Sequence, residues 1–149
     1  MAAKATSTRL GHTAIATQDP ARVAQFYRGL LDLQIVRQTS SPAVGDAVLL
    51  TGDPAREEHE LVLLTNAAAR HIAFRTETIE QLRSVYNRAK RMGLQIPYAL
   101  DSGTAIGFFI RDPEGNAVEI YLAANEPHRD KPPLSEPDEI DRLILDGSP

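Results

Sequence analysis

The hydrophobic positions in the first half of the chain predict a strand, a helix and three further strands. Residues 10–17 alternate between two sets of side chains at every second position, which is the period of a strand. Asp19 and Pro20 then supply a helix N-cap and a proline at the first helical position. The next apolar residues follow the helical period and are expected to face the core together: Val23, Phe26, Tyr27, Leu30 and Leu31. Short strands are expected at 34–38, 46–51 and 59–64, between turn sequences.

The second half predicts the same order of elements. Residues 70–76 are predicted as a strand that opens with a histidine, and Thr78 with Gln81 has the spacing of a capping box. The helix that follows has its apolar face at Ile79, Leu82, Val85, Tyr86 and Ala89. Gly93 is the expected helix stop. Strands are expected at 95–98, 104–110 and 117–122.

Several residues of the two halves match at a common offset, which indicates an internal duplication. His12 and His71 stand 59 positions apart, and so do Tyr27 and Tyr86. Glu119 has its counterpart at Glu60 with the same offset. Each half therefore carries a histidine on its first strand and a glutamate on its last. Because neither half can cover both faces of its sheet alone, we expect an α+β fold in which two curved sheets pair into one half-barrel.

Glu119 occupies the middle of a predicted strand whose other residues are apolar. The strands at 108–110 and 118–122 flank a turn that contains Asp-Pro and Glu-Gly, so they are predicted to form a hairpin. A buried carboxylate without a partner costs several kcal/mol or loses its charge. A cation should therefore meet Glu119, either an arginine or lysine or a metal ion, unless the side chain points outward.

Composition limits the possible functions. The chain has 149 residues, a net charge of −4 and no cysteine, which excludes disulfides, thiol catalysis and zinc-thiolate sites. Scattered basic residues do not suggest nucleic acid as a partner, and no apolar run approaches the roughly 18 residues of a membrane span. A cytoplasmic location is expected, because the N-terminus is too polar for a signal peptide. We expect one domain over residues 1–124, followed by a proline-rich tail, 125–149, in which 135–145 could form a short helix.

Several of these motifs resemble the vicinal oxygen chelate superfamily. The resemblance covers roughly residues 10–123 and rests on four segments: Gly11-His12-Thr13-Ala14-Ile15-Ala16, Phe26-Tyr27-Arg28-Gly29-Leu30-Leu31-Asp32-Leu33, His71-Ile72-Ala73-Phe74 and Asp112-Pro113-Glu114-Gly115-Asn116. The superfamily includes glyoxalase I, extradiol dioxygenases, fosfomycin-resistance proteins, methylmalonyl-CoA epimerase and metal-free bleomycin-binding proteins. The resemblance implies paired βαβββ modules, about 9–66 and 69–124, that cup a divalent metal. It also implies a small-molecule substrate that presents two adjacent oxygens, and a homodimer.

His12, His71 and Glu119 fall on the ligand positions that the family's extradiol dioxygenases and fosfomycin-resistance enzymes share. Two imidazoles and one carboxylate on one face of an ion leave neighbouring positions open, an arrangement that suits Fe²⁺ or Mn²⁺. Ni²⁺ or Zn²⁺ would fit a glyoxalase-like site. The alternative is that both histidines are satisfied core residues and that Glu119 pairs with an arginine.

His59 and Glu60 are adjacent on a predicted strand, so only one of them can face the site unless a bulge intervenes. If Glu60 faces it, the resemblance implies a four-ligand site like that of glyoxalase I, with isomerase or lyase chemistry. If His59 faces it, the residue matches the histidine that acts as acid or base towards dioxygen in extradiol dioxygenases.

The local sequence is most similar to small one-domain catechol-dioxygenase-like proteins, with two departures. Phe109 stands where the family has a tyrosine, and Leu100, Asp101 or Ser102 stands where it has a loop histidine. Tyr98 is a candidate substitute for the tyrosine. We therefore expect a metal-dependent enzyme that is closest to the extradiol dioxygenases. The alternatives are a glyoxalase-type isomerase or lyase and a metal-free ligand-binding protein of the bleomycin-resistance type.

Overall fold

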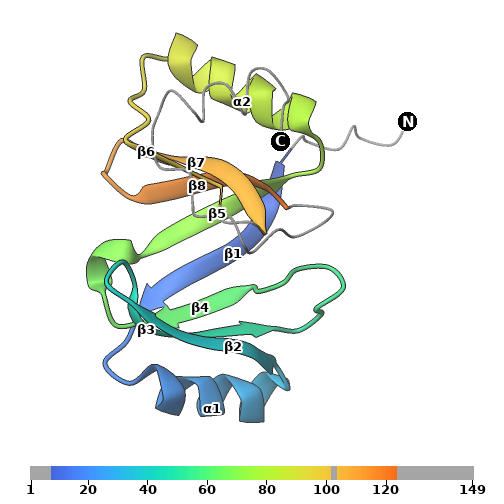
Figure 1. Cartoon of the computed structure of the whole chain (residues 1–149), viewed down its shortest axis with the longest axis vertical. Coiled ribbons are helices and arrows are strands. Elements are labelled where there is room, and N and C mark those ends of the chain that lie inside the picture. Colours follow the sequence, from blue (N-terminus) through green and yellow to red (C-terminus); the bar gives the residue numbers. More distant parts are fainter. Residues whose placement is uncertain (1–7, 102–103, 124–149) are drawn as a thin grey trace. The chain divides into compact units, whose positions relative to one another are not determined.

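The computed structural model describes residues 8–101 and 104–123. The tail that begins at residue 124, with its predicted helix, lies outside the described residues. The elements run in the order β1 (Thr8–Ala16), α1 (Pro20–Leu31), β2 (Gln34–Ser41), β3 (Gly45–Thr51), β4 (Leu61–Leu64), a 3-10 turn (Ala67–Ala69), β5 (His71–Thr76), α2 (Ile79–Arg91), β6 (Tyr98–Asp101), β7 (Ala105–Arg111) and β8 (Ala117–Ala123) (Figure 1). This order is βαβββ twice, so the predicted duplication of an α+β module is confirmed.

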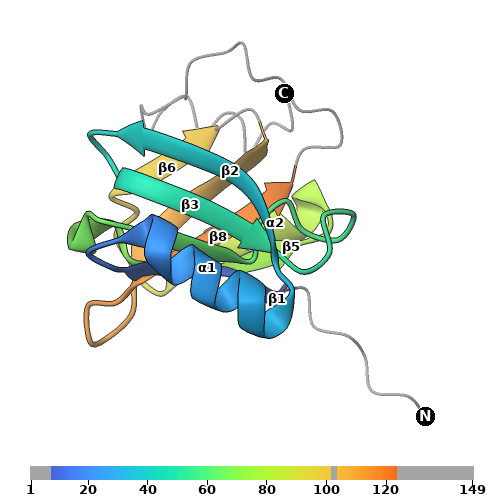
Figure 2. The same cartoon turned by 90° about the horizontal axis from the view of Figure 1, so that it is seen from below.

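The strand order repeats in the two modules. The strands are hydrogen-bonded in the order β2-β3-β4-β1-β5-β8-β7-β6. The strands of the first module thus follow the order second, third, fourth, first, and those of the second module follow the same order in reverse. Within the first module β1 pairs with β4 in parallel, and the long β2–β3 hairpin is antiparallel (Figure 2). By internal contacts the chain divides into two units, and the boundaries at 10/11 and 72/73 fall inside β1 and β5.

In the unit Gly11–Ile72, hydrophobic residues cover both faces of the sheet. One face packs against α1 through Ala24, Val48, Leu50 and Leu63. The opposite face carries Ala14, Ala47, Leu49, Val62 and Leu64. His12 is two residues before Ala14 on β1 and therefore lies on this second face.

In the other unit, α2 covers the sheet through one cluster of apolar side chains. Its buried members are Leu82, Tyr86, Ala89, Ala99, Phe108 and Ile120. The helix begins at the predicted capping box, in which Thr78 and Gln81 each bond the other's backbone. It is followed by Gly93 with a φ of +74°, as expected of a helix stop. None of the helices in the described part of the chain is long and apolar enough to cross a membrane.

The predicted core face of α1 is wrong in part. Val23 and Tyr27 pack into the core, but Phe26, Leu30 and Leu31 are 60%, 65% and 57% exposed. The helix makes its closest approach through Ala24, which is fully buried, and a residue two positions away points about 200° around the helix. Phe26 therefore faces away from the sheet, while Leu30 and Leu31 occupy the last turn.

Candidate metal centre

His12 and His71 face each other from neighbouring strands. Their Nε2 atoms are 3.1 Å apart, and the rings meet edge-on at 83°. His12 is buried and His71 is half-buried. The Nδ1 of His71 lies 2.9 Å from the carbonyl of Ala69, which can only accept a hydrogen bond. The proton of a neutral His71 is therefore on Nδ1, and the lone pair on Nε2 is available as a ligand.

Glu119 lies at the centre of β8, as predicted, and is 8% exposed. It is opposite Phe109 in the β7–β8 ladder. His12, His71 and Glu119 can each offer one ligand atom, and these atoms all lie within 4.8 Å of one another. Imidazole nitrogens and a carboxylate oxygen are a donor set that binds divalent transition metals. The three residues predicted from the sequence as ligands thus form a group that fits a metal ion.

The register that places Glu119 is set by the turn between β7 and β8. Asp112 accepts hydrogen bonds from the backbone N–H groups of Glu114 and Asn116 and from the Asn116 side chain, at 2.8 to 2.9 Å. These bonds, led by that from the Asn116 side chain, hold the pKa of Asp112 below its ordinary value. Gly115 closes the turn with a φ of +86°. The Asp-Pro-Glu-Gly-Asn sequence therefore acts as a rigid hairpin turn.

Close backbone packing fixes the same hairpin a second time at Gly107. This residue is opposite Tyr121, and a Cβ atom placed on it would collide with the carbonyl oxygen of Ile120 and the Cβ of Tyr121. Only glycine lets β7 and β8 approach this closely. No role for Gly107 was predicted from the sequence.

His59 and Glu60 were predicted to lie on the strand at 59–64, but β4 begins only at Leu61. The two side chains have different partners. The ring centroid of His59 is 4.5 Å from that of His12. The Glu60 carboxylate accepts hydrogen bonds from the Thr51 hydroxyl at 3.0 Å and from the Gly52 N–H at 2.8 Å. The prediction from the repeat, that Glu60 points where Glu119 does, stays a prediction; the backbone of Glu60 is hydrogen-bonded to Leu50 and Thr13, just ahead of β4.

The two departures from the dioxygenase pattern lie on β6 and β7. Phe109 is opposite Glu119, so both side chains point to the same face of the hairpin. The backbone of Tyr98 pairs with Phe109 on the other side, in the same row. Asp101 is buried, and Ser102 lies outside the described residues. A phenyl ring thus stands beside the carboxylate, where the family has a tyrosine hydroxyl.

Two charged residues near His59, Arg37 and Glu58, were not predicted as site residues. Arg37 Nη2 lies 3.1 Å from Glu58 Oε1, and Glu58 Oε2 lies 3.9 Å from His59 Nδ1. The acidic run before His59 was a usable signal. The placement of Arg37 depends on a β-bulge for which the sequence gives no sign.

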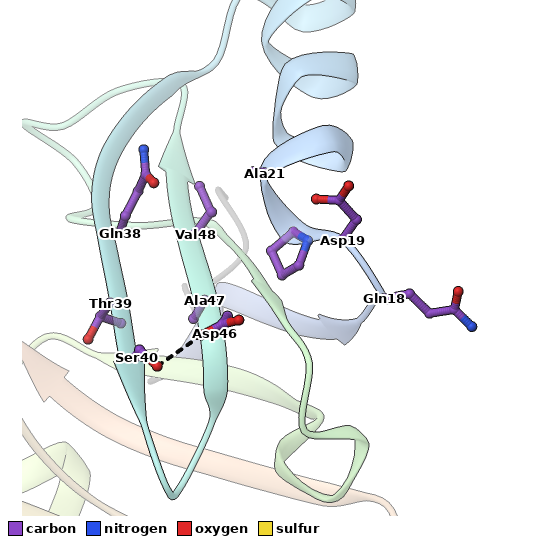
Figure 3. A pocket seen from close by; sticks show the side chains of 10 residues that line it. Gln18, Asp19, Ala21, Gln38, Thr39, Ser40, Asp46, Ala47 and Val48 are labelled. Atoms are coloured by element: carbon purple, nitrogen blue, oxygen red, sulfur yellow. Dashed lines mark hydrogen bonds between the residues drawn. The ribbon is translucent and has the colours of Figure 1, made fainter.

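A cavity of about 510 Å³ opens elsewhere in the Gly11–Ile72 unit, between the start of α1 and strands β2 and β3 (Figure 3). Its two acidic side chains already have partners. Asp46 accepts a hydrogen bond from Ser40 at 2.9 Å, and Asp19 caps α1 by accepting one from the Arg22 N–H. None of the predicted site residues lines this cavity.

Comparison with known proteins identifies the fold. The family model described as Glyoxalase/Bleomycin resistance protein/Dioxygenase superfamily matches residues 9–120. The chain has no match among curated proteins. Among solved structures it is similar to 2,2',3-trihydroxybiphenyl 1,2-dioxygenase from Sphingomonas wittichii strain RW1, with a TM-score of 0.65 and 19% identity, over 87% of this chain and 47% of that one.

Two further structures represent different activities on this fold. A catechol 2,3-dioxygenase matches with a TM-score of 0.62 and 20% identity, over 82% of this chain and 42% of that one. Methylmalonyl-CoA epimerase from Streptomyces coelicolor matches with a TM-score of 0.61 and 21% identity, over 83% of this chain and 99% of that one. The chain spans less than half the length of the two dioxygenases and nearly the whole epimerase. The chain has a metal-site-like group of two histidines and one glutamate. Because the family model matches residues 9–120, the chain belongs to the Glyoxalase/Bleomycin resistance protein/Dioxygenase superfamily.

Proposed function

We propose that the protein is a divalent-metal-dependent enzyme that binds a small substrate through two adjacent oxygens, with extradiol-dioxygenase-like chemistry. The observation that carries the proposal is the group of ligand atoms from His12, His71 and Glu119, within 4.8 Å of one another. In this proposal the three residues hold the ion. A divalent ion bound there would polarise the substrate oxygens as a Lewis acid.

His59 is the proposed acid or base. Its ring lies against His12, so it can reach a substrate held beside that ligand. A neutral imidazole can accept a proton from a substrate hydroxyl and return it later in the reaction. Phe109 cannot donate or accept a proton and therefore serves as an apolar wall. Fe²⁺ or Mn²⁺ is the proposed metal.

Glu60 defines the second candidate function, a glyoxalase-type isomerase or lyase with four ligands. Glu60 is not a member of the group of ligand atoms that His12, His71 and Glu119 form, and this supports the three-ligand proposal instead. The Glu60 carboxylate accepts both of its hydrogen bonds, from Thr51 and Gly52, with one oxygen, Oε1, and these bonds hold the side chain where it is.

Elemental analysis of protein purified without added metal tests the proposal. We expect one iron or manganese per chain in the wild type and less than about a tenth of that in His71→Ala, because a site that loses one of three ligands binds far more weakly. Iron-loaded protein should consume dioxygen when a catechol is added. Nickel or zinc with no dioxygen uptake would favour the isomerase. No metal, and none taken up on addition, would contradict the proposal and favour the metal-free binding protein.

A further inference from the structure

A β-bulge in β2 determines which face of the sheet Arg37 occupies. Ile35 pairs with Leu50 and Arg37 with Leu49, so Val36 is an extra residue with no opposite partner. Directly opposed residues point to the same face. Leu50 is on the face that packs against α1, and Leu49 is on the other.

Without the bulge, Arg37 would share the α1 face with Ile35, two residues before it. The bulge turns Arg37 to the face of Leu49 and Ala14 instead. This is also the face of His12. Bulges are frequent beside active sites because they redirect a single side chain in this way.

On this face the charged groups form a chain of contacts that ends at the histidines. Arg37 Nη2 is 3.1 Å from Glu58 Oε1, and Glu58 Oε2 is 3.9 Å from His59 Nδ1. The His59 ring then lies 4.5 Å from the His12 ring. All of these residues belong to the Gly11–Ile72 unit.

The loop that carries Glu58 and His59 is anchored independently of these charges. The backbone N–H of Glu60 donates to the carbonyl of Leu50 at 2.8 Å, and the Thr51 hydroxyl lies 3.1 Å from the carbonyl oxygen of Glu57. The loop should therefore keep its course when Glu58 loses its charge. The Arg37 and Glu58 side chains are 38% and 34% exposed, and ion pairs at such exposure add little to stability.

We propose that Glu58, held by Arg37, is a positioning residue whose charge, 3.9 Å from Nδ1, sets the tautomer of His59. A carboxylate beside Nδ1 favours the proton on that nitrogen, because the N–H dipole then points at the negative charge. The lone pair is then on Nε2, the nitrogen farther from Glu58. What His59 does with this lone pair depends on the proposed function, in which it acts as a base towards the substrate.

The imidazole ¹⁵N spectrum of the protein without added metal tests the positioning directly. The chain has four histidines, so each can be assigned by single replacement. At roughly pH 8.5, two units above the ordinary imidazole pKa, the tautomer is read from the two nitrogen shifts. We expect His59 of the wild type to carry its proton on Nδ1. In Glu58→Gln and Arg37→Leu the Nδ1–H signal should be lost as the proton moves to Nε2.

Two variants serve as controls. Arg37→Lys keeps a positive charge near Glu58 and should restore at least part of the Nδ1–H signal. Glu77→Gln breaks an ion pair of the same length, Arg9 to Glu77 at 3.1 Å, in the other unit and should leave His59 unchanged. A His59 spectrum that is the same in Glu58→Gln as in the wild type would overturn the proposal.

Kinetics of the metal-loaded protein give the second readout. Glu58→Gln should lower kcat about 10- to 100-fold, the usual effect of removing a residue that orients a functional group, with metal content and KM unchanged. An equal loss of metal content would overturn the positioning role. A wild type that binds no metal would defeat the proposed function alone, since the ¹⁵N spectrum still decides whether Glu58 sets the tautomer of His59.

Discussion

Replacing Glu60 and Glu119 separately by glutamine distinguishes the three-ligand from the four-ligand site. The two glutamates are repeat-related, and glutamine keeps the shape of each side chain. The structure gives them different surroundings. Glu60 accepts hydrogen bonds from Thr51 and Gly52, and Glu119 belongs to the group with His12 and His71.

The expected stability cost at Glu60 follows from its two hydrogen bonds. Glutamine retains an Oε1 acceptor for both, but a charge-assisted bond is roughly twice as strong as a neutral one, so the change should cost about 1 to 2 kcal/mol. For a chain of this size that lowers Tm by roughly 2 to 8 °C. Metal content should not change. Glu119→Gln should weaken metal binding by more than about 100-fold, beyond the range for residues that only support a ligand.

Thermal unfolding with and without Mn²⁺ is the assay, with metal content after dialysis measured alongside. Metal at 100 times its dissociation constant stabilises a protein by about 2.7 kcal/mol, which here raises Tm by roughly 5 to 10 °C. Wild type and Glu60→Gln should show this rise, and Glu119→Gln should not. Loss of the rise in Glu60→Gln, or its retention in Glu119→Gln, would refute the reasoning.

Three further predictions concern the fold. Gly107→Ala should destabilise the protein by about 1 to 3 kcal/mol or more in urea titration, because the added Cβ would meet the β8 backbone. Gly29→Ala, where the space around the α1 residue is open, should stabilise the protein by about 0.5 to 1 kcal/mol. Equal effects of the two substitutions would contradict the close packing at Gly107. Phe26→Gln should change the free energy of unfolding by less than about 0.5 kcal/mol, because Phe26 is exposed. A loss above about 2 kcal/mol would show that Phe26 is part of the core face, as the sequence predicted. Asn116→Ala should raise the pKa of Asp112, measured by NMR titration. Because that pKa is lowered in the folded state, the stability that Asp112 contributes is present above the ordinary carboxyl pKa and is lost as pH falls through the folded pKa. An unchanged pKa would disprove that the Asn116 side chain lowers it.

Much of the fold was readable because the sequence states it twice. The common offset of His12 to His71 and of Tyr27 to Tyr86 predicted two equivalent modules before any contact was known. Glu119 was identified by a physical argument, the cost of burying a carboxylate among apolar neighbours. These inferences depend on the order and spacing of residues, which the sequence contains.

The remaining features depend on packing that the sequence does not state. The apolar stripe of α1 gave no sign that the sheet covers only the side with Ala24 and Tyr27. The directions of His59 and Glu60 depend on local contacts ahead of β4, with the His12 ring for His59 and with Thr51 and Gly52 for Glu60. Arg37 points to the face of the sheet that carries His12 only because of the bulge at Val36, and no glycine or proline in the sequence marks this bulge.

The most direct test of the central claim is anomalous diffraction from crystals of the protein grown with Mn²⁺. We predict one strong anomalous peak per chain, from an Mn²⁺ ion coordinated by the Nε2 atoms of His12 and His71 and by a carboxylate oxygen of Glu119. A peak bound by other residues, or no peak at saturating Mn²⁺, would contradict the account.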